Sequence, residues 1–196
     1  MVYKVTLIGH SYVGDLSRCG KTEIVVFDTV FRLNFFSVSG ATFSTFINNP
    51  VYFDQLKSQL PDIVIVILGG NDLKINIDLS QNYEECANFY NTLREKIPGA
   101  IIIASQIENR FYSEGNRFNS PSSQTFDYLR RHFNRFLKNK HFKDCLMQIQ
   151  GPGRLDEERY YRDGVHLNSN GLKKYFEIIE NTLSYTLQKF FYVDKS

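Results

Sequence analysis

The sequence predicts an α/β fold, a three-layer α/β/α sandwich built on a parallel sheet. Three observations support this prediction. Short apolar runs recur along the chain, and helical patterns with apolar residues every three to four positions lie between them. Polar turns, several of them rich in glycine, follow the apolar runs. Strands that alternate with helices are typical of right-handed βαβ crossovers, and therefore of a sheet covered by helices on both faces.

Five apolar runs are the predicted strands. Residues 63–68 and 101–103 consist only of Ile, Val and Leu. Continuous aliphatic runs of this kind suit strands that are buried on both faces, as in a parallel sheet. The five predicted strands are Tyr3–Ile8, Glu23–Phe27, Asp62–Leu68, Ala100–Ser105 and Cys145–Ile149.

Four helices are predicted from the spacing of apolar residues and from their end signals. One is capped by Ser80 and continues to Ile97, where Pro98-Gly99 ends it. A shorter helix runs from Val51 to Leu60, ahead of a proline. The other two begin near Phe126 and at Asn168 or Ser169.

The length and composition suit one globular domain, residues 1–196, with a sizeable core. The chain has 196 residues, of which 42% are hydrophobic, and a formal net charge of only +2, so the charge demands no anionic partner. Three widely spaced cysteines form no disulfide framework, which favours a reducing, cytoplasmic location. We find no signal-peptide pattern and no apolar run long enough to span a bilayer. The sequence is equally compatible with one domain of a longer protein.

The turn Gly9-His10-Ser11 raises the question of whether Ser11 is a nucleophile or a helix cap. The segment lacks the second glycine of a Gly-x-Ser-x-Gly nucleophile elbow. A phosphate-binding loop ending in Gly20-Lys21-Thr22 would need glycine where the chain has Asp15. Serine is also common as a helix cap. The role of Ser11 therefore depends on residues elsewhere in the chain.

A base and a carboxylate occur together in Asp163-Gly164-Val165-His166, just before the last helix. A three-residue spacing within a turn can bring a carboxylate against an imidazole. Asp163 would then hold one ring nitrogen of His166 and leave the other to take the proton of Ser11. These three residues are the candidate catalytic triad.

Three donors are candidates for stabilising a developing oxyanion. The backbone N–H of Ser11 would lie at a helix N-terminus, where the potential is positive. Gly40, in a second turn, allows close approach of a backbone N–H because it has no Cβ. Asn71 follows the most apolar predicted strand and offers a side-chain amide.

Taken together, these segments resemble the four sequence blocks of the SGNH (GDSL-type) hydrolase family, in the same order. The blocks are Gly9-His10-Ser11, Gly40, Gly69-Gly70-Asn71-Asp72 and Asp163-Gly164-Val165-His166, and the resemblance spans residues 5–168. It implies a five-stranded parallel, flavodoxin-like sheet and a serine esterase mechanism. It further implies Ser11 as nucleophile, His166 as base, Asp163 as its orienting partner, and an oxyanion hole from Ser11, Gly40 and Asn71. No metal or organic cofactor is implied, and by analogy we expect short, acetyl-type acyl groups.

Two details of the resemblance are narrower. The residues LIGHSYVGDL and GGND are similar to the esterase domains in first-frame proteins of some LINE-type retrotransposons. His10 occupies the position where the family usually has Asp. His10 either supplies the hydrogen bond that the Asp would make or influences the choice of substrate.

Other functions are compatible with parts of the sequence. The helix near 126–143 carries Arg131, Arg135 and Lys138 opposite its apolar stripe, which favours a solvated outer face. The same residues could attract phospholipid head groups or nucleic acid, in a binding module with vestigial activity. A lysophospholipase or thioesterase would share every catalytic residue. The aromatic loop at 111–118 could be a lid or an acyl-binding wall, or it could be a packed loop.

Overall fold

One sheet of six strands organises the chain. The computed structural model describes residues 1–74, 78–111, 122–140, 146–148 and 161–191. Within them the strands lie in the order β2-β3-β1-β4-β5-β6. Their bounds are β1 Val2–Gly9, β2 Glu23–Val26, β3 Thr29–Ser37, β4 Ile63–Ile67, β5 Ile101–Ser105 and β6 Leu146–Met147. The predicted α/β class is confirmed.

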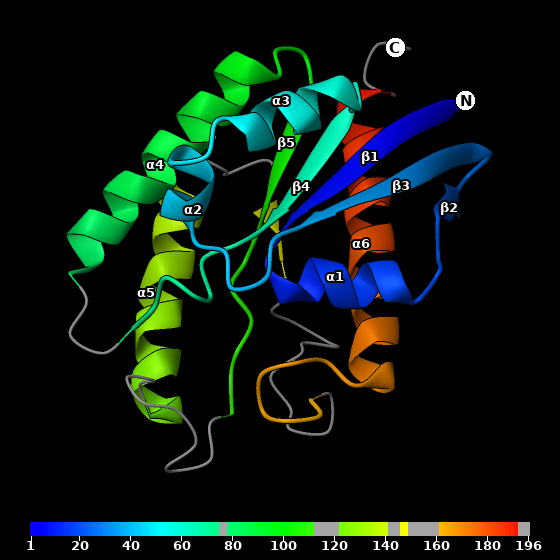
Figure 1. Ribbon diagram of the computed structural model, residues 1–196. Helices are drawn as coiled ribbons and strands as arrows, with labels where there is room; N and C mark the ends of the chain where they lie inside the picture. The colour runs from blue at the N-terminus through cyan, green and yellow to red at the C-terminus, as the bar shows by residue number, and fades with distance from the viewer. Residues whose placement is uncertain (75–77, 112–121, 141–145, 149–160, 192–196) are drawn as a thin grey trace.

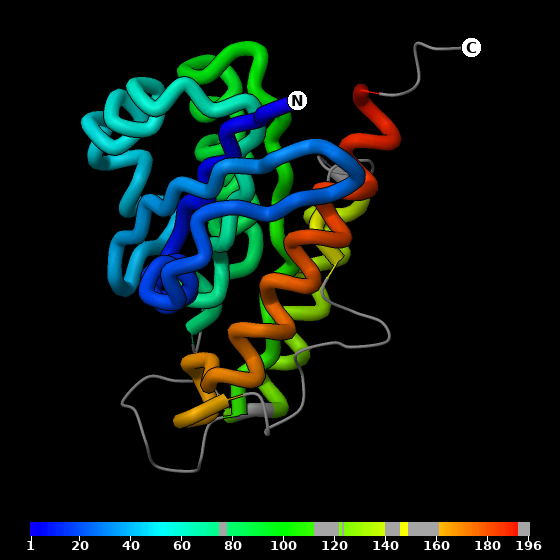
Figure 2. The backbone as a smooth tube through the Cα atoms, turned by 90° about the vertical axis from the view of Figure 1, so that its right-hand side faces the viewer, coloured from blue at the N-terminus to red at the C-terminus, as the bar shows by residue number. Residues whose placement is uncertain are grey.

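The sheet is mixed but mostly parallel, which refines the predicted five-stranded parallel sheet. Strands β3, β1, β4, β5 and β6 are parallel, and only β2 is antiparallel. Residues 23–27 were expected in the parallel set, and this was wrong because a tight hairpin returns β2 along β3. Figure 2 shows this hairpin reaching toward the C-terminal part of α6 (Ser169–Phe190), which contacts β2.

Two helical layers cover the two faces of the sheet (Figure 1). Helices α1 (Ser11–Arg18) and α6 pack on one face. The other face is covered by α2 (Phe43–Ile47), α3 (Val51–Ser58), α4 (Leu79–Lys96) and α5 (Ser123–Lys140). Successive residues of β4 alternate between the two cores, with Ile65 in the first and Val66 in the second. The aliphatic run is therefore continuous because both faces of β4 are buried.

The helix ends follow local hydrogen-bonding rules. Asn168 was one of the two residues predicted to start the last helix, and it is the cap of α6. Its side chain accepts hydrogen bonds from the N–H groups of Asn170 and Gly171. The cap of α4 is Asp78 and not Ser80, because the Asp78 carboxylate accepts the Ser80 N–H. No helix within the described ranges is long and apolar enough to cross a membrane.

Parallel strands bring their carboxyl ends to one edge of the sheet. The segments after β1, β3, β4 and β5 lie at this edge and are joined by hydrogen bonds between distant parts of the chain. Val38 donates its N–H to the Gly9 carbonyl at 2.9 Å, and His10 donates to Ile67 at 3.3 Å. The turn that contains the predicted site residues Asp163 and His166 is joined to the loop after β5 by a hydrogen bond from Phe111 to Gly164.

Candidate active site

The turn Gly9-His10-Ser11 is fixed by close packing between the ends of β1 and β4. A Cβ at Gly9 would lie 2.1 Å from the carbonyl oxygen of Ile67, so only glycine fits there. The chain then enters α1 directly, and Ser11 is its first residue. Its side chain is half-buried, and within the described residues neither its hydroxyl nor its backbone N–H has a hydrogen-bond partner. The turn therefore presents Ser11 at a helix N-terminus, with both groups unpaired in the part of the chain that the structure describes.

His10, and not Ser11, is the helix cap. The Nδ1 atom of His10 accepts a hydrogen bond from the N–H of Tyr12 at 3.4 Å. The ring is buried, and burial, together with the positive charges of Arg110 and His166, lowers the pKa of His10 to about 3. A neutral imidazole thus makes a capping hydrogen bond, as the first of the two interpretations of His10 expects.

Asp163 and His166 meet in a small, self-supporting turn. The Nδ1 atom of His166 lies 2.7 Å from Oδ2 of Asp163. The other carboxylate oxygen accepts the N–H groups of Val165 at 3.0 Å and His166 at 2.6 Å. Partial burial acts to raise the pKa of Asp163, but these three hydrogen bonds outweigh it and lower the pKa to about 2. The carboxylate is ionised at neutral pH, so Nδ1 carries the hydrogen and Nε2 is the basic nitrogen.

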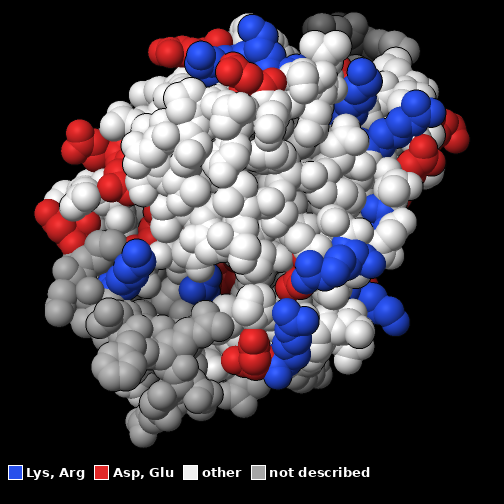
Figure 3. All heavy atoms as spheres, viewed as in Figure 1, with Lys and Arg blue, Asp and Glu red and all other residues white. Residues whose placement is uncertain are grey.

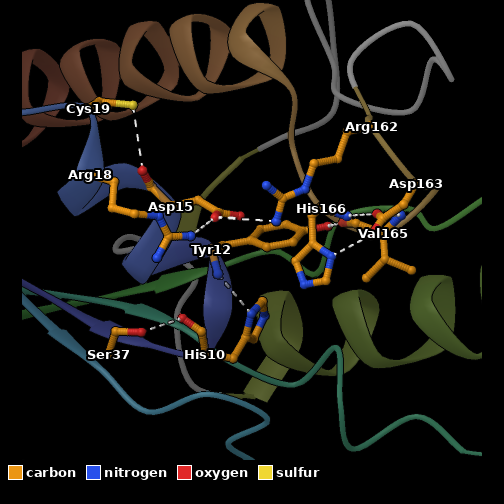
Figure 4. A network of polar contacts seen from close by, with 10 residues as sticks. All are labelled: His10, Tyr12, Asp15, Arg18, Cys19, Ser37, Arg162, Asp163, Val165 and His166. Carbon is orange, nitrogen blue, oxygen red and sulfur yellow. Dashed lines mark hydrogen bonds and ion pairs between the residues drawn. The ribbon is translucent and has the colours of Figure 1, made fainter.

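Two long-range contacts attach this turn to the rest of the site, and Figure 4 shows the first of them. The Tyr12 hydroxyl, one residue after Ser11, donates to the carbonyl of Val165. Phe111, in the loop after β5, donates its N–H to the Gly164 carbonyl at 2.7 Å. The backbones touch so closely that a Cβ at Gly164 would lie 1.8 Å from the Phe111 carbonyl oxygen. The turn that carries His166 is therefore attached both to α1 and to the loop after β5.

Gly40 and Asn71 come together at the same edge. The Asn71 amide nitrogen donates to the carbonyl of Ala41, next to Gly40, at 3.1 Å. This uses one of its two hydrogens. Gly40 has a φ of 70° and open space where a Cβ would be, and its N–H has no acceptor within the described residues. Two of the predicted donors are thus adjacent, and each retains a hydrogen that none of the described residues accepts.

The described residues do not contain a hydrogen bond between the Ser11 hydroxyl and Nε2 of His166. The structure brings Asp163 and His166 into contact and leaves the Ser11 end of the predicted triad open. In ligand-free sites this contact is often longer than a hydrogen bond and shortens when substrate binds. Among the described residues, no group of three His, Cys, Asp or Glu is arranged to hold a metal ion.

Three residues that support the site had no assigned role in the sequence. They are Tyr12, Arg110 and Asp72. The buried Asp72 accepts the N–H of Phe43 at 3.1 Å and so ties the Gly40 turn to the Asn71 turn. Burial raises the pKa of Asp72 to about 7, although the hydrogen bond from Phe43 opposes this. Asp72 and Tyr12 each belong to a segment that the sequence singled out, GGND and LIGHSYVGDL, whereas no sequence signal pointed to Arg110.

The predicted basic residues of α5 lie on the surface. Arg131, Arg135 and Lys138 are exposed, and Arg131 forms an ion pair with Asp127. In the loop after β5, Phe111 packs against Tyr161 with ring centroids 5.3 Å apart. The rest of the predicted aromatic loop, Tyr112 and Phe118 included, lies outside the described residues.

The face in view in Figure 3 is largely free of charge. Residues 33–53, which include most of β3, the Gly40 turn and α2, contain no Lys, Arg, Asp or Glu. Charged side chains lie around the rim of this surface (Figure 3). The Gly40 turn therefore borders a neutral surface.

A mostly parallel sheet between two helical layers, with an Asp-His pair just before the last helix, has the architecture of a three-layer α/β hydrolase. A model of the GDSL-like lipase/acylhydrolase family matches residues 16–174. The chain belongs to this family, as the sequence motifs predicted. The match includes Asp163 and His166 and begins just after Ser11.

Solved structures share the fold at low sequence identity. A GDSL-like lipase from Bacteroides thetaiotaomicron is 15% identical with a TM-score of 0.62, covering 95% of this chain and 88% of that one. A carbohydrate esterase of family 3 from Talaromyces cellulolyticus is 17% identical with a TM-score of 0.64, covering 96% and 99%. A catalytic mutant of an acetylxylan esterase from Geobacillus stearothermophilus is 14% identical with a TM-score of 0.61, covering 92% and 94%. No curated protein matches the chain. None of these findings bears on the retrotransposon resemblance, which stays a prediction.

Proposed function

We propose that this protein is a serine esterase that hydrolyses short-chain, acetyl-type carboxylic esters. Ser11 is the nucleophile, His166 the general base and Asp163 the residue that orients it. The Ser11 and Gly40 N–H groups and the Asn71 amide form the oxyanion hole. The observation that carries this proposal is the contact of 2.7 Å between Asp163 and His166, on a turn that Tyr12 ties to the helix that Ser11 begins.

The reaction follows from these positions. Nε2 of His166 takes the Ser11 proton as the hydroxyl oxygen bonds to the carbonyl carbon, and the negative charge moves to the carbonyl oxygen beside the donors. When the tetrahedral intermediate collapses, the bond to the leaving oxygen breaks and His166 protonates the departing alcohol. A water molecule, deprotonated by His166, then attacks the acyl-enzyme, and the acid and free Ser11 are released.

The short-acyl preference is supported by one comparison. The neutral surface around Gly40 bears on a different property, because it suits an uncharged ester better than an anionic one. One structure of the same fold is an acetylxylan esterase, so acetyl esters are hydrolysed on this scaffold. A lysophospholipase or thioesterase would use the same residues and would prefer longer or sulfur-linked acyl groups.

The test is hydrolysis of p-nitrophenyl acetate, butyrate and octanoate by the wild type and by Ser11→Ala. We expect turnover to fall to background in Ser11→Ala and acetate to be hydrolysed fastest. Ser17→Ala is the matched control, because Ser17 is an exposed serine of the same helix. Equal turnover by Ser11→Ala and the wild type would reject the mechanism, whereas faster turnover of octanoate would reject only the short-acyl preference.

The basic residues of α5 provide a separate test of the binding-module alternative. Reversing the charges of Arg131, Arg135 and Lys138 is expected to leave ester hydrolysis unchanged. Loss of binding to anionic vesicles or nucleic acid in this variant, with binding retained in Ser11→Ala, would instead support a binding function.

A further inference from the structure

We propose that Arg110 is a positioning residue of the oxyanion hole, which orients the Asn71 amide toward the reacting carbonyl. This inference rests on the proposed esterase function. Arg110 follows β5, in a loop to which the sequence assigned no chemistry. The residue is only 6% exposed, which is unusual for arginine and calls for a specific role.

The contact with Asn71 fixes which way the amide points. Nη2 of Arg110 donates to Oδ1 of Asn71 at 2.9 Å. The nitrogen of the same Asn71 amide donates to the carbonyl of Ala41 at 3.1 Å. Rotating the amide by 180° would place its NH₂ group against the guanidinium and its oxygen against a carbonyl, so both contacts would become repulsive. The remaining N–H is thereby held toward the site beside Gly40.

Arg110 is itself held rigidly. Its guanidinium carbon lies 5.2 Å from the centre of the Phe126 ring on α5. Its Nη2 atom occupies the space where a side chain at Gly70 would begin, because a Cβ there would lie 2.6 Å from it. The glycine before Asn71 thus admits the guanidinium to the backbone of the turn.

The same stretch of chain holds the catalytic base. Phe111, the next residue, bonds to Gly164 in the turn that carries His166. Two consecutive residues therefore connect the donor side of the site to the acid–base side. The guanidinium charge also reaches the nucleophile turn, because after burial it is the second cause of the lowered pKa of His10. A fixed positive charge behind Asn71 would strengthen the amide as a donor to an oxyanion.

The experiment is a double-mutant cycle on p-nitrophenyl acetate hydrolysis with Arg110→Met, Asn71→Ala and the double variant. Removing an oxyanion donor costs roughly 100-fold in kcat, so we expect about that loss in Asn71→Ala. Arg110→Met is expected to lose about 10-fold or more in kcat with KM within about twofold. The double variant should be no slower than Asn71→Ala, because Arg110 acts through Asn71.

A matched control separates positioning from stability. Arg130 is buried to nearly the same degree, and its guanidinium pairs with Asp127. Arg130→Met is expected to lower the melting temperature but to leave kcat within about twofold. If Arg110→Met does not fold, Arg110→Lys takes its place in the cycle, with a smaller but still non-additive loss expected, since one ammonium group replaces the planar fork.

The outcomes are distinct. Unchanged kcat in the Arg110 variant, or losses that multiply in the double variant, would overturn the role of Arg110 while the esterase mechanism stands. Activity that survives in Ser11→Ala would overturn the esterase mechanism, and with it the role of Arg110. A loss confined to kcat that disappears in the Asn71→Ala background supports the inference.

Discussion

Oδ2 of Asp163 lies 2.7 Å from Nδ1 of His166, while Oδ1 of the same carboxylate accepts two backbone N–H groups of the same turn. The carboxylate therefore cannot rotate without breaking all three contacts. It fixes the imidazole and its tautomer at once, so that Nε2 is left as the basic nitrogen. The acid–base half of the site is thus built within four residues.

The first prediction concerns Asp163. Asp163→Ala should lower kcat/KM for p-nitrophenyl acetate by about 10²–10⁴-fold, because the imidazole loses both its orientation and the charge that stabilises its protonated form. Asp54→Asn, on the exposed start of α3, is the control and should be unaffected. An Asp163→Ala variant with wild-type activity would show that another group orients His166.

A second prediction concerns acid stability and His10. The pKa of His10 falls from 6.5 to about 3 on folding, so the unfolded chain binds a proton between these values and the folded chain does not. Stability contributed by neutral His10 is therefore complete above pH 6.5 and is lost as pH falls toward 3. His10→Asn retains a capping side chain without the proton site. The free energy of unfolding of this variant, relative to that of the wild type, should therefore rise by on the order of 3 kcal/mol from pH 7 to pH 4. Urea unfolding at both pH values measures this gain, and a pH-independent difference would contradict it.

A third prediction concerns Glu108, which accepts a hydrogen bond from the Tyr175 hydroxyl in the core. Burial raises the pKa of Glu108 from 4.5 to about 7, although Tyr175 and nearby arginines oppose the shift. A raised pKa gives stability that is present below pH 4.5 and is lost as pH rises through 7. Glu108→Gln keeps an acceptor for Tyr175 and removes the buried charge. Its free energy of unfolding relative to the wild type should therefore rise by on the order of 3 kcal/mol from pH 4.5 to pH 8. Parallel pH profiles for the two proteins would refute this account of Glu108.

A fourth prediction compares two glycines with the same backbone conformation. Gly164 has a φ of 74° and Gly20 a φ of 71°, but only at Gly164 would a Cβ collide, 1.8 Å from Phe111. Gly20→Ala should lower the free energy of unfolding by about 1 kcal/mol, because alanine adopts the left-handed backbone conformation at that cost. Gly164→Ala should cost at least about 2 kcal/mol more, since the backbone must also move, and it should lower kcat by displacing His166. Thermal unfolding and p-nitrophenyl acetate assays of both variants test this, and equal effects would show that the Phe111 contact is unimportant.

The sequence predicted the strands whose two faces are both buried, because such strands are continuous aliphatic runs. It missed β3, where Phe31 and Leu33 are buried but Arg32 and Asn34 are exposed, so that polar residues interrupt the apolar pattern. It also missed α2, a helix of five residues, which is too short to show a period.

The site residues could be predicted as far as they belong to short motifs. Contacts between distant residues could not. Tyr12 and Val165 are 153 positions apart, and Arg110 and Asn71 are 39 apart, so no local spacing relates them. These pairs meet only because the parallel sheet gathers its carboxyl ends at one edge. The motifs thus indicate which chemistry is present, and the fold determines which side chains support it.

The most direct test of the proposed mechanism is to identify the residue that reacts. The protein is treated with a fluorophosphonate ester, which phosphonylates activated serines, and the modified peptide is located by mass spectrometry. We expect one modification, on Ser11, that is abolished in Ser11→Ala and greatly slowed in His166→Ala. Modification of a different serine, or none in a protein that hydrolyses p-nitrophenyl acetate, would contradict the assignment of Ser11 as the nucleophile.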